Sequence, residues 1–172
     1  SYIFSYPAVL NFQTITNDGF IDVSASDITA TSGIVNNGTL LFYGGVNYNN
    51  ITGSGDIGVI AGETVYNDMT ATISQSTITV EGVFINDNGT DDAVTATNGF
   101  IVESTGVLQS NASSLAGDIT NDGQLTFTGG TNDNEISGTG NFITSSGDVI
   151  NSANITQSTI AINSGATFET NA

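Results

Sequence analysis

The sequence predicts an all-β protein folded as a parallel β-solenoid of about eight coils, and three observations support this prediction. Two stretches that lie 85 positions apart are versions of each other: IVNNGTLLFYGGVNYNNITGSGDI, from Ile34, and ITNDGQLTFTGGTNDNEISGTGNF, from Ile119. Apolar and polar residues alternate through most of the chain. Glycine-containing turn signals recur about every 21 residues along its length.

The duplicated stretches share 12 of 24 positions, and as far as Gly44 the shared positions are every second residue. A period of two is expected of an extended strand, because successive side chains point to opposite faces. The shared positions include Ile34, Leu40 and Phe42, so the shared face should be buried. The parity then shifts by one at Gly45, which predicts a corner where glycine lets the backbone bend.

A second pair of related segments extends the duplication: ISQSTITVEG from Ile73 and ITQSTIAINSG from Ile155, at an offset of 82. Short strands at a spacing of roughly 21 residues are typical of a solenoid, in which each strand pairs in parallel with its equivalent one coil further on. The alternative is a β-sandwich, which would place hairpin connections about every 8 to 12 residues. The longer spacing and the duplication favour stacked coils.

We expect one solenoid domain over residues 1–172, with a first repeat copy at 17–100 and a second at 101–172. Residues 1–16 begin with SYIFSYPAVLNF, which is more apolar than its surroundings and holds the single proline. This segment is interpreted either as a cap on the first coil or as an exchange strand that docks into a neighbouring subunit. The exposed edges of a solenoid are rows of unpaired backbone groups, so both interpretations are open.

The composition excludes several classes of function. The chain has no Lys, Arg, His or Cys, and its 17 acidic residues give a formal charge of −17. Nucleic-acid binding draws its affinity from cations placed against phosphates, so no nucleic-acid partner is expected. No stretch approaches the ~18 apolar residues of a spanning helix, so no membrane insertion is expected. Disorder is disfavoured because β-branched and aromatic residues are plentiful.

No enzyme activity and no cofactor other than calcium are expected. Most nucleophile and base arrangements need His, Cys or Lys, and only paired carboxylates remain. The alternative function is a carbohydrate-binding or polysaccharide-degrading β-helix. Tyr43, Tyr48 and Tyr66 are the residues on which sugar faces would stack.

Two acidic turns, NDNGTDD and TNDNE, are weak candidates for calcium binding. Ca²⁺ prefers six to eight oxygens from carboxylates, amides and backbone carbonyls, and each turn offers several within a few residues. Neither turn has the spacing of an EF-hand or of a calcium-binding nonapeptide repeat, so solvated acidic turns are the competing interpretation. The candidate ligands are Asp87, Asn88, Asp91, Asp92, Asp133 and Glu135.

The recurring asparagines suggest a structural role. Asn36 and Asn121 precede a turn glycine in both copies of the duplicated stretch. Stacked Asn side chains can hydrogen-bond from one coil to the next, as they do in cross-β arrangements. We therefore expect a polar ladder at this corner.

The pattern N-N-G-T-L-x-F, followed by G-G and then by N-I-x-G-x-G, resembles the passenger-domain repeats of bacterial autotransporters and of two-partner-secreted adhesins. The resemblance covers about half of the chain directly. It implies a right-handed parallel β-helix that is extracellular, on a bacterial cell surface, and acts as a stalk, an adhesin or a self-assembling filament subunit. The implied partners are other copies or a larger surface protein, and host or cell-surface glycans. The chain is short for such a passenger, so we expect a slice of a larger protein or a subunit of an assembly.

Overall fold

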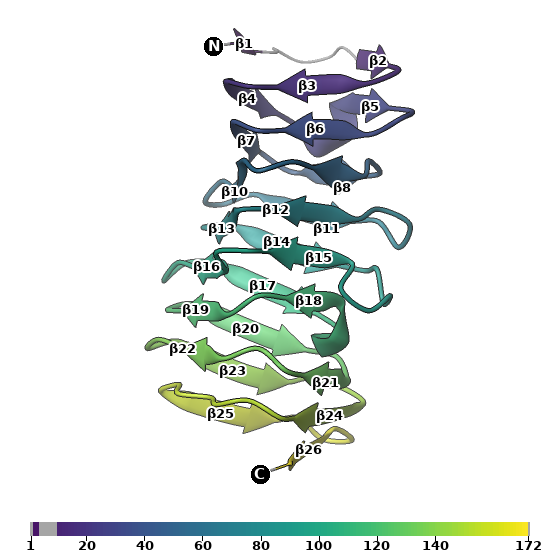
Figure 1. Cartoon of the computed structure of the whole chain (residues 1–172). Coiled ribbons are helices and arrows are strands. Elements are labelled where there is room, and N and C mark those ends of the chain that lie inside the picture. The colour runs from purple at the N-terminus through teal and green to yellow at the C-terminus, as the bar shows by residue number, and fades with distance from the viewer. Residues whose placement is uncertain (1, 4–9, 172) are drawn as a thin grey trace.

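The computed structural model describes residues 2–3 and 10–171 of the chain. The described residues form 26 short strands and two three-residue 3-10 helices, η1 (Ala25–Asp27) and η2 (Ala112–Ser114). All pairs of strands that share hydrogen bonds in this part of the chain are parallel. The protein is therefore a parallel β-solenoid, as predicted, and the β-sandwich alternative is wrong. Figure 1 shows the coils stacked into a rod with the two ends of the chain at opposite ends.

Three long sheets form the sides of the rod, and the chain visits them in turn. Sheet 1 contains β1 (Tyr2–Ile3), β4 (Phe20–Val23), β7 (Thr39–Phe42), β10 (Asp56–Val59), β13 (Thr77–Val80), β16 (Phe100–Val102), β19 (Ile119–Asn121) and β22 (Ile136–Ser137). Sheet 2 contains β8 (Gly45–Asn47), β11 (Thr64–Asn67), β14 (Val83–Asn86), β17 (Val107–Ser110), β20 (Gln124–Phe127), β23 (Asn141–Thr144) and β25 (Thr159–Ile162).

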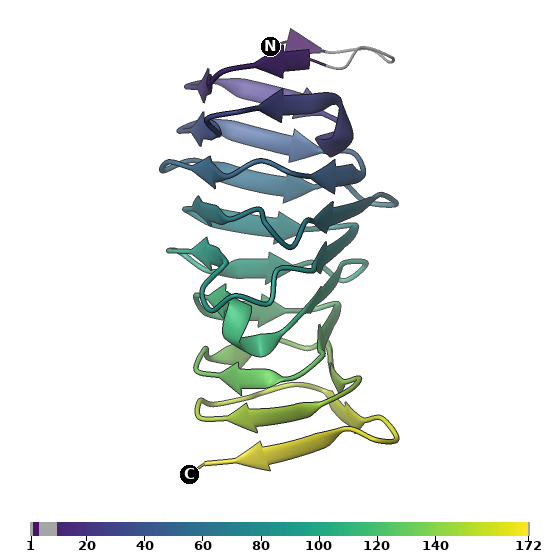
Figure 2. The same ribbon diagram turned by 90° about the vertical axis from the view of Figure 1, so that its right-hand side faces the viewer.

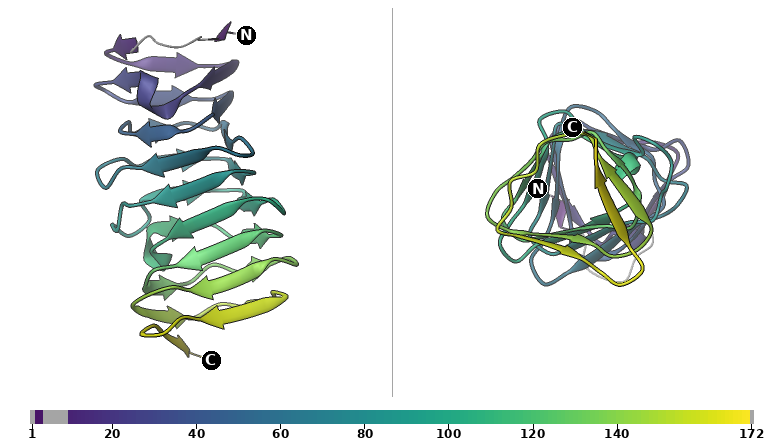
Figure 3. Two further views of the ribbon diagram at one scale, coloured as in Figure 1. Left: turned by 180° about the vertical axis from the view of Figure 1, so that it is seen from behind. Right: turned by 90° about the horizontal axis from the view of Figure 1, so that it is seen from below.

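Sheet 3 contains β3 (Ile15–Asn17), β6 (Ile34–Asn36), β9 (Ile51–Thr52), β12 (Ile73–Gln75), β15 (Val94–Ala96) and β18 (Leu115–Ala116). Two shorter sheets complete the coils near the ends. They are the pair β2 (Leu10–Phe12) and β5 (Ile28–Ala30), and the trio β21 (Gly130–Asn132), β24 (Asp148–Asn151) and β26 (Thr167–Thr170). Figures 2 and 3 show the stack from two other sides, and the axial view in Figure 3 shows the roughly triangular outline of the coils.

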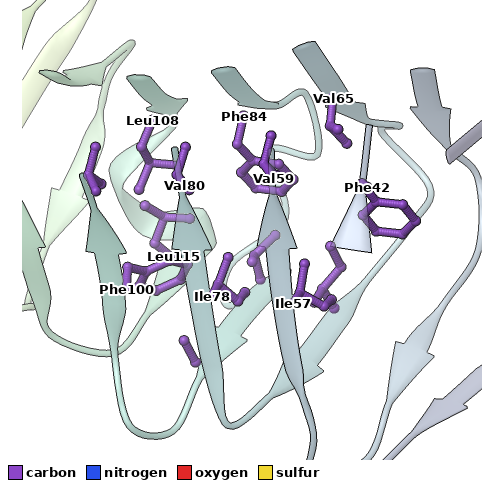
Figure 4. Packing of buried hydrophobic residues seen from close by; sticks show 14 of the residues in the cluster. Phe42, Ile57, Val59, Val65, Ile78, Val80, Phe84, Phe100, Leu108 and Leu115 are labelled. Atoms are coloured by element: carbon purple, nitrogen blue, oxygen red, sulfur yellow. The ribbon is translucent and has the colours of Figure 1, made fainter. Parts of the chain in front are cut away.

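The inward positions of the strands form one continuous apolar core, because alternate residues of each strand point into the coil. Partner residues keep the same face from coil to coil, as in the column Leu40, Ile57 and Ile78. Figure 4 shows this packing from close by. The largest fully buried side chains include Phe42, Phe84, Phe100, Phe127 and Phe142. Each such side chain contributes about 1.5–3 kcal/mol by leaving water.

The predicted corner at Gly44 and Gly45 is confirmed. These residues connect β7 in sheet 1 to β8 in sheet 2, and their φ angles are +94° and +99°. L-residues with a side chain rarely adopt such angles, so glycine is required here. The corner explains why the shared positions of the two copies change parity at this point.

The duplication is out of step with the coils by one strand. β6 and its duplicate β19 are thirteen strands apart, and three strands make one coil. One copy therefore spans four coils and one additional strand, so β6 belongs to sheet 3 whereas β19 belongs to sheet 1. The same local sequence builds the same strand–turn–strand unit on a different side of the rod.

A row of buried asparagines runs along the rod at the C-terminal ends of the strands of sheet 2. The side chain N–H of Asn47 donates to Asn67 Oδ1 at 2.8 Å, and that of Asn67 donates to Asn86 Oδ1 at 2.9 Å. The second N–H of each side chain bonds a backbone carbonyl of the following turn, such as Ala71 O at 3.0 Å for Asn67. Because every bond is internal, these amides are buried without an unmet hydrogen bond.

The predicted ladder at Asn36 is confirmed, since Asn17 Nδ2 donates to Asn36 Oδ1 at 2.6 Å. Asn121 also bonds across coils, donating to Asn141 O at 3.0 Å. Its Oδ1 is buried without a hydrogen-bond partner in the described structure, because the strand partner of Asn121 in the preceding coil is Val102. The ladder is therefore more complete in the first copy than in the second.

The segment 1–16 lies partly outside the described residues, which omit residues 1 and 4–9. Its described strands β1, β2 and β3 pair in parallel with β4, β5 and β6 of the same chain. No helix in the described part of the chain is long and apolar enough to cross a membrane.

Candidate functional site

An acidic hollow lies on the side of the rod near η2 and spans three successive coils. Its volume is about 370 Å³, and Asp91, Asp92 and Asp133 provide its carboxylates. The turn before β15 supplies the first two, and the end of β21 supplies the third. The lining is completed by Ser113, Leu115, Ala116, Thr131 and Asn134.

The hollow owes its shape to hydrogen bonds around η2. Ser113 O accepts from Asp92 N at 2.9 Å, and Ser113 Oγ accepts from Thr131 N at 2.8 Å. Asn134 Nδ2 donates to Leu115 O at 2.9 Å, and Asn134 Oδ1 accepts from Gly117 N at 2.9 Å. These bonds fix the backbone that carries the carboxylates and leave the carboxylates on the surface.

The structure thus brings together three of the six predicted calcium ligands, from two turns that lie 40 residues apart. Asp87, Asn88 and Glu135 do not line the hollow. Asn88 is buried and structural, because its Nδ2 donates to Ala71 O and its Oδ1 accepts from Thr90 N. Glu135 Oε1 accepts a hydrogen bond from Asn154 Nδ2 at 3.4 Å.

No group of three or more acidic side chains in the described part of the chain is close enough to hold a metal ion. The hollow therefore offers negative charge on an open surface and lacks the closed oxygen cage that calcium prefers. Calcium binding at these weak candidates stays a prediction, and solvated acidic turns remain the competing interpretation.

The three tyrosines named for sugar stacking lie in different settings. Tyr48 and Tyr66 are exposed, at 61% and 41%, whereas Tyr43 is half-buried. Tyr66 lies on the outer face of β11 beside Val46 of β8, and Tyr48 follows β8 directly. Two exposed aromatic side chains therefore lie on neighbouring coils of one side of the rod.

The C-terminal coil exposes residues that occupy core positions. Ile160 and Ile162 of β25 pair with Phe142 and Thr144 of β23 in the preceding coil, yet they are 48% and 51% exposed. Phe168 of β26 is half-buried, and its ring centroid lies 5.6 Å from that of Phe142. Among the described residues β25 and β26 are the outermost strands of their sheets, so this coil presents apolar side chains and strand edges.

The electrostatic character of the surface is uniformly acidic. The chain has no Lys, Arg or His to pair with its carboxylates, so their only partners in the chain are neutral hydrogen-bond donors. Thr139 donates its N–H and its hydroxyl to Asp122 Oδ1, both at 2.8 Å, and these bonds lower the pKa of that carboxyl below its ordinary value of 3.8. The hydroxyl and the N–H of Thr70 lower the pKa of Asp68 in the same way.

Comparison with protein-family models, with curated proteins and with solved structures finds no match to this chain. The likeness to adhesin passenger repeats therefore rests on the residues of the chain and on the solenoid fold.

Proposed function

We propose that this protein is a structural, non-catalytic rod of an extracellular surface, which acts as a stalk or filament subunit by stacking coil upon coil. The proposal is supported most strongly by one pair of duplicated segments. Ile78 and Val80 in STITV are fully buried, and their equivalents Ile160 and Ile162 in STIAI are about half exposed.

The difference arises from what covers each segment. Phe100 and Val102 of β16 lie on Ile78 and Val80 as strand partners in the next coil. Within the described residues, no coil lies on Ile160 and Ile162. They present the kind of surface that is covered inside the rod, and a further parallel coil, from a longer chain or from a second copy, would fit it.

The acidic surface is consistent with an extracellular location. A chain without Lys or Arg has no cleavage site for trypsin-like proteases, and its charge of −17 opposes lateral clumping of neighbouring rods. Association would then be favoured where a coil presents apolar side chains, as at Ile160 and Ile162. The likeness to adhesin passenger repeats points to the same location.

The experiment is analytical ultracentrifugation and negative-stain electron microscopy of the 172-residue chain over a range of concentrations. We expect a 17.6 kDa monomer that associates end to end as its concentration rises. Ile160→Asn combined with Ile162→Asn should abolish the association, whereas Met69→Asn, at a 69% exposed site on the side of the rod, should not. A monomer at all concentrations, or association that the Ile160/Ile162 variant does not change, would contradict stacking.

A second candidate is glycan binding by the side of the rod. It is favoured by the exposure of Tyr48 and Tyr66 on neighbouring coils, because sugar faces stack on aromatic rings. A glycan array probed with the protein and with Tyr48→Ser and Tyr66→Ser variants tests it. Signals that both variants remove would support an adhesin, and the absence of any glycan signal would reject this candidate.

A further inference from the structure

A shallow groove of about 180 Å³ lies on the outer face of sheet 1, along strand β10. The outward residues of this stretch are Asp56, Gly58 and Ile60, because the inward ones, Ile57 and Val59, are buried in the core. Gly58 interrupts the row of outward side chains, and the groove lies at this interruption. It is separate from the acidic hollow near η2 and from the end of the rod.

The walls of the groove come from the two neighbouring strands. Gly58 pairs with Leu41 of β7 on one side and with Thr79 of β13 on the other. A Cβ atom built on Gly58 would lie 2.5 Å from Leu41 Cδ2, so the Leu41 side chain extends over the glycine. The floor and walls are therefore largely apolar.

The backbone does not require glycine at this position. Gly58 is not among the residues with positive φ, and the Cβ of an alanine would meet only the flexible end of the Leu41 side chain. At Gly55, by contrast, a Cβ would meet the Gly38 carbonyl oxygen, so that glycine is needed for the fold. A glycine inside a strand can mark a bulge, a bend or a close approach by a ligand or another segment, and here it makes room for the end of the Leu41 side chain and leaves the groove open beside it.

The duplicated copy lacks both features of the groove. Ile143 stands 85 positions after Gly58, and Asn141 stands 85 positions after Asp56. β23, which carries Ile143, lies in sheet 2 between Thr126 and Ala161, so its outer face differs from that of β10 in both side chains and neighbours. The groove is a property of the first copy alone.

A carboxylate lies at each end of the groove. Asp56 Oδ1 accepts from Thr77 N at 3.1 Å, which fixes the carboxylate at one end. Glu81 lines the other end near Ile60, roughly 13 Å further along the strand direction. The chain contains no cation that could occupy either end, so any charge partner must come from outside.

We propose that this groove binds a linear aliphatic diammonium ion, of the polyamine class. Its methylene chain would lie along β10 against the side chains of Leu41 and Thr79, and its two ammonium groups would bind Asp56 and Glu81. An inorganic cation gains nothing from the apolar floor, whereas an alkyl chain is stabilised by contact with it. The lysine side chain of a partner protein has a single ammonium group and could bind only one of the two carboxylates. A free diamine could bind both, so the pair of carboxylates favours the diamine.

The experiment is a titration of the ¹⁵N-labelled 172-residue chain with cadaverine and with spermidine, followed by NMR at fixed ionic strength. We expect saturable shifts of the amide signals of Leu41, Gly58 and Thr79. Hexylamine, which has one charge, should bind up to about fivefold more weakly, because one exposed ion pair is lost. Magnesium ions should not reproduce the shifts at these amides.

Four variants test the geometry. Gly58→Ile fills the groove, and it should weaken binding about tenfold or more; circular dichroism of the variant checks that it stays folded. Asp56→Asn and Glu81→Gln should weaken binding of the diamine to the level of hexylamine. Glu103→Gln is the matched control, because Glu103 is exposed, lies one coil beyond Glu81 and does not line the groove.

Three outcomes would overturn the proposal. The first is binding that Gly58→Ile does not change, which would indicate a diffuse counter-ion only. The second is a set of shifts spread over all acidic turns and displaced equally by magnesium. The third is tighter binding of a lysine-containing peptide than of either diamine at Gly58, which would assign the groove to a protein partner.

Discussion

The side chain of Asn36 donates a hydrogen bond to Gln75 Oε1 at 2.6 Å, although Gln75 lies two coils further along the rod. The same contact recurs in the second copy, where Asn121 Nδ2 donates to Gln157 Oε1 at 2.6 Å. The coil that lies between these two partners has a glycine at this place. Ile34 and Val35 pair with Ile51 and Thr52 of that coil, so the next residue, Gly53, stands opposite Asn36.

Two glycines in each copy make this contact possible. A Cβ at Gly53 would lie 2.2 Å from Asn36 O, and a Cβ at Gly55 would lie 2.8 Å from Asn36 Nδ2. Gly138 and Gly140 stand in the same relation to Asn121. The duplicated motifs TGSG (52–55) and SGTG (137–140) are therefore explained by the passage of an amide side chain across a coil.

The first prediction concerns the length of the Gln75 side chain. Gln75→Asn shortens it by one methylene, so its oxygen should fall about 1.5 Å short of Asn36 Nδ2. We expect the free energy of unfolding to fall by about 1–2 kcal/mol. The buried Asn36 Nδ2 group would lose one of its two hydrogen-bond acceptors, Gln75 Oε1, and keep the other, Asp56 O. Urea unfolding followed by circular dichroism measures this.

Gln124→Asn is the control for that variant. Gln124 is half-buried, and its Nε2 bonds only Thr126 of its own strand, at 3.2 Å. Its substitution should change unfolding free energy by less than about 0.5 kcal/mol. Equal effects of the two substitutions would show that the bond between Asn36 and Gln75 does not stabilise the protein.

The second prediction concerns Gly55. In Gly55→Ala the new Cβ would lie 2.1 Å from Gly38 O and would also meet Asn36 Nδ2, and the backbone oxygen has little freedom to move. We expect a loss of about 2–3 kcal/mol in urea unfolding. Gly89→Ala is the control, since a Cβ there meets nothing within 4 Å, and its effect should stay within about 0.5 kcal/mol. A loss as small for Gly55→Ala as for the control would contradict the close stacking of these coils.

The strands and the corner could be predicted from the sequence because they depend on neighbouring residues. The alternation of Ile34, Asn36 and Gly38 defines one face, and the change of parity at Gly45 marks the turn between two sheets. The ladder at Asn36 was predictable for the same reason, since both copies keep this asparagine.

The partners across coils could not be predicted, because they depend on the length of each coil. Strand partners are 17 residues apart at Leu40 and Ile57 but 24 apart at Phe84 and Leu108. These differences in coil length add up over several coils. The sequence spacing therefore does not reveal the contact between Asn36 and Gln75 or the one-strand offset of the duplication. The differences also hide the placement of Asp92 and Asp133 around one hollow, so the acidic hollow became visible only in the structure.

The third prediction concerns the carboxyl of Asp122. Its pKa is lowered by the Thr139 N–H and then by the Thr139 hydroxyl. A depressed pKa in the folded state means that these bonds stabilise the fold above the ordinary value of 3.8, and that this contribution is lost as the pH falls through the folded pKa. Thr139→Val removes only the hydroxyl, so the pKa should rise part of the way toward 3.8.

Carbon-detected NMR of the Asp122 carboxyl between pH 2 and 7 measures this change. Thr120→Val, in the strand that precedes Asp122, leaves both bonds intact and should leave the pKa unchanged. An Asp122 pKa that is the same with and without the Thr139 hydroxyl would show that this bond is absent in solution.

The fourth prediction concerns cations. With 17 acidic residues and no basic ones, the folded chain repels itself, so added salt should raise the melting temperature by screening. Calcium and magnesium should raise it equally, because the acidic hollow lacks a closed set of ligands. Differential scanning fluorimetry with each ion at equal ionic strength, followed by chelation, checks this.

Asp133→Asn and the exposed Glu169→Gln form a matched pair for the cation experiment, since each removes one negative charge. Both should shift the melting temperature alike in the presence of calcium. A stabilisation specific to calcium that Asp133→Asn removes and Glu169→Gln keeps would instead establish a calcium site in the hollow.

The parallel stacking of the coils is tested most directly by disulfide crosslinking, which is clean because the chain has no native cysteine. On the outer face of β11 and β14, Thr64 pairs with Val83 and Tyr66 pairs with Ile85. A disulfide needs Cα atoms within about 7 Å of each other. Parallel strands in this register predict rapid oxidation of Thr64→Cys with Val83→Cys and of Tyr66→Cys with Ile85→Cys, and no crosslink between Thr64→Cys and Ile85→Cys. Efficient crosslinking of the last pair, with failure of the first two, would mean that the strands run antiparallel and would contradict the solenoid.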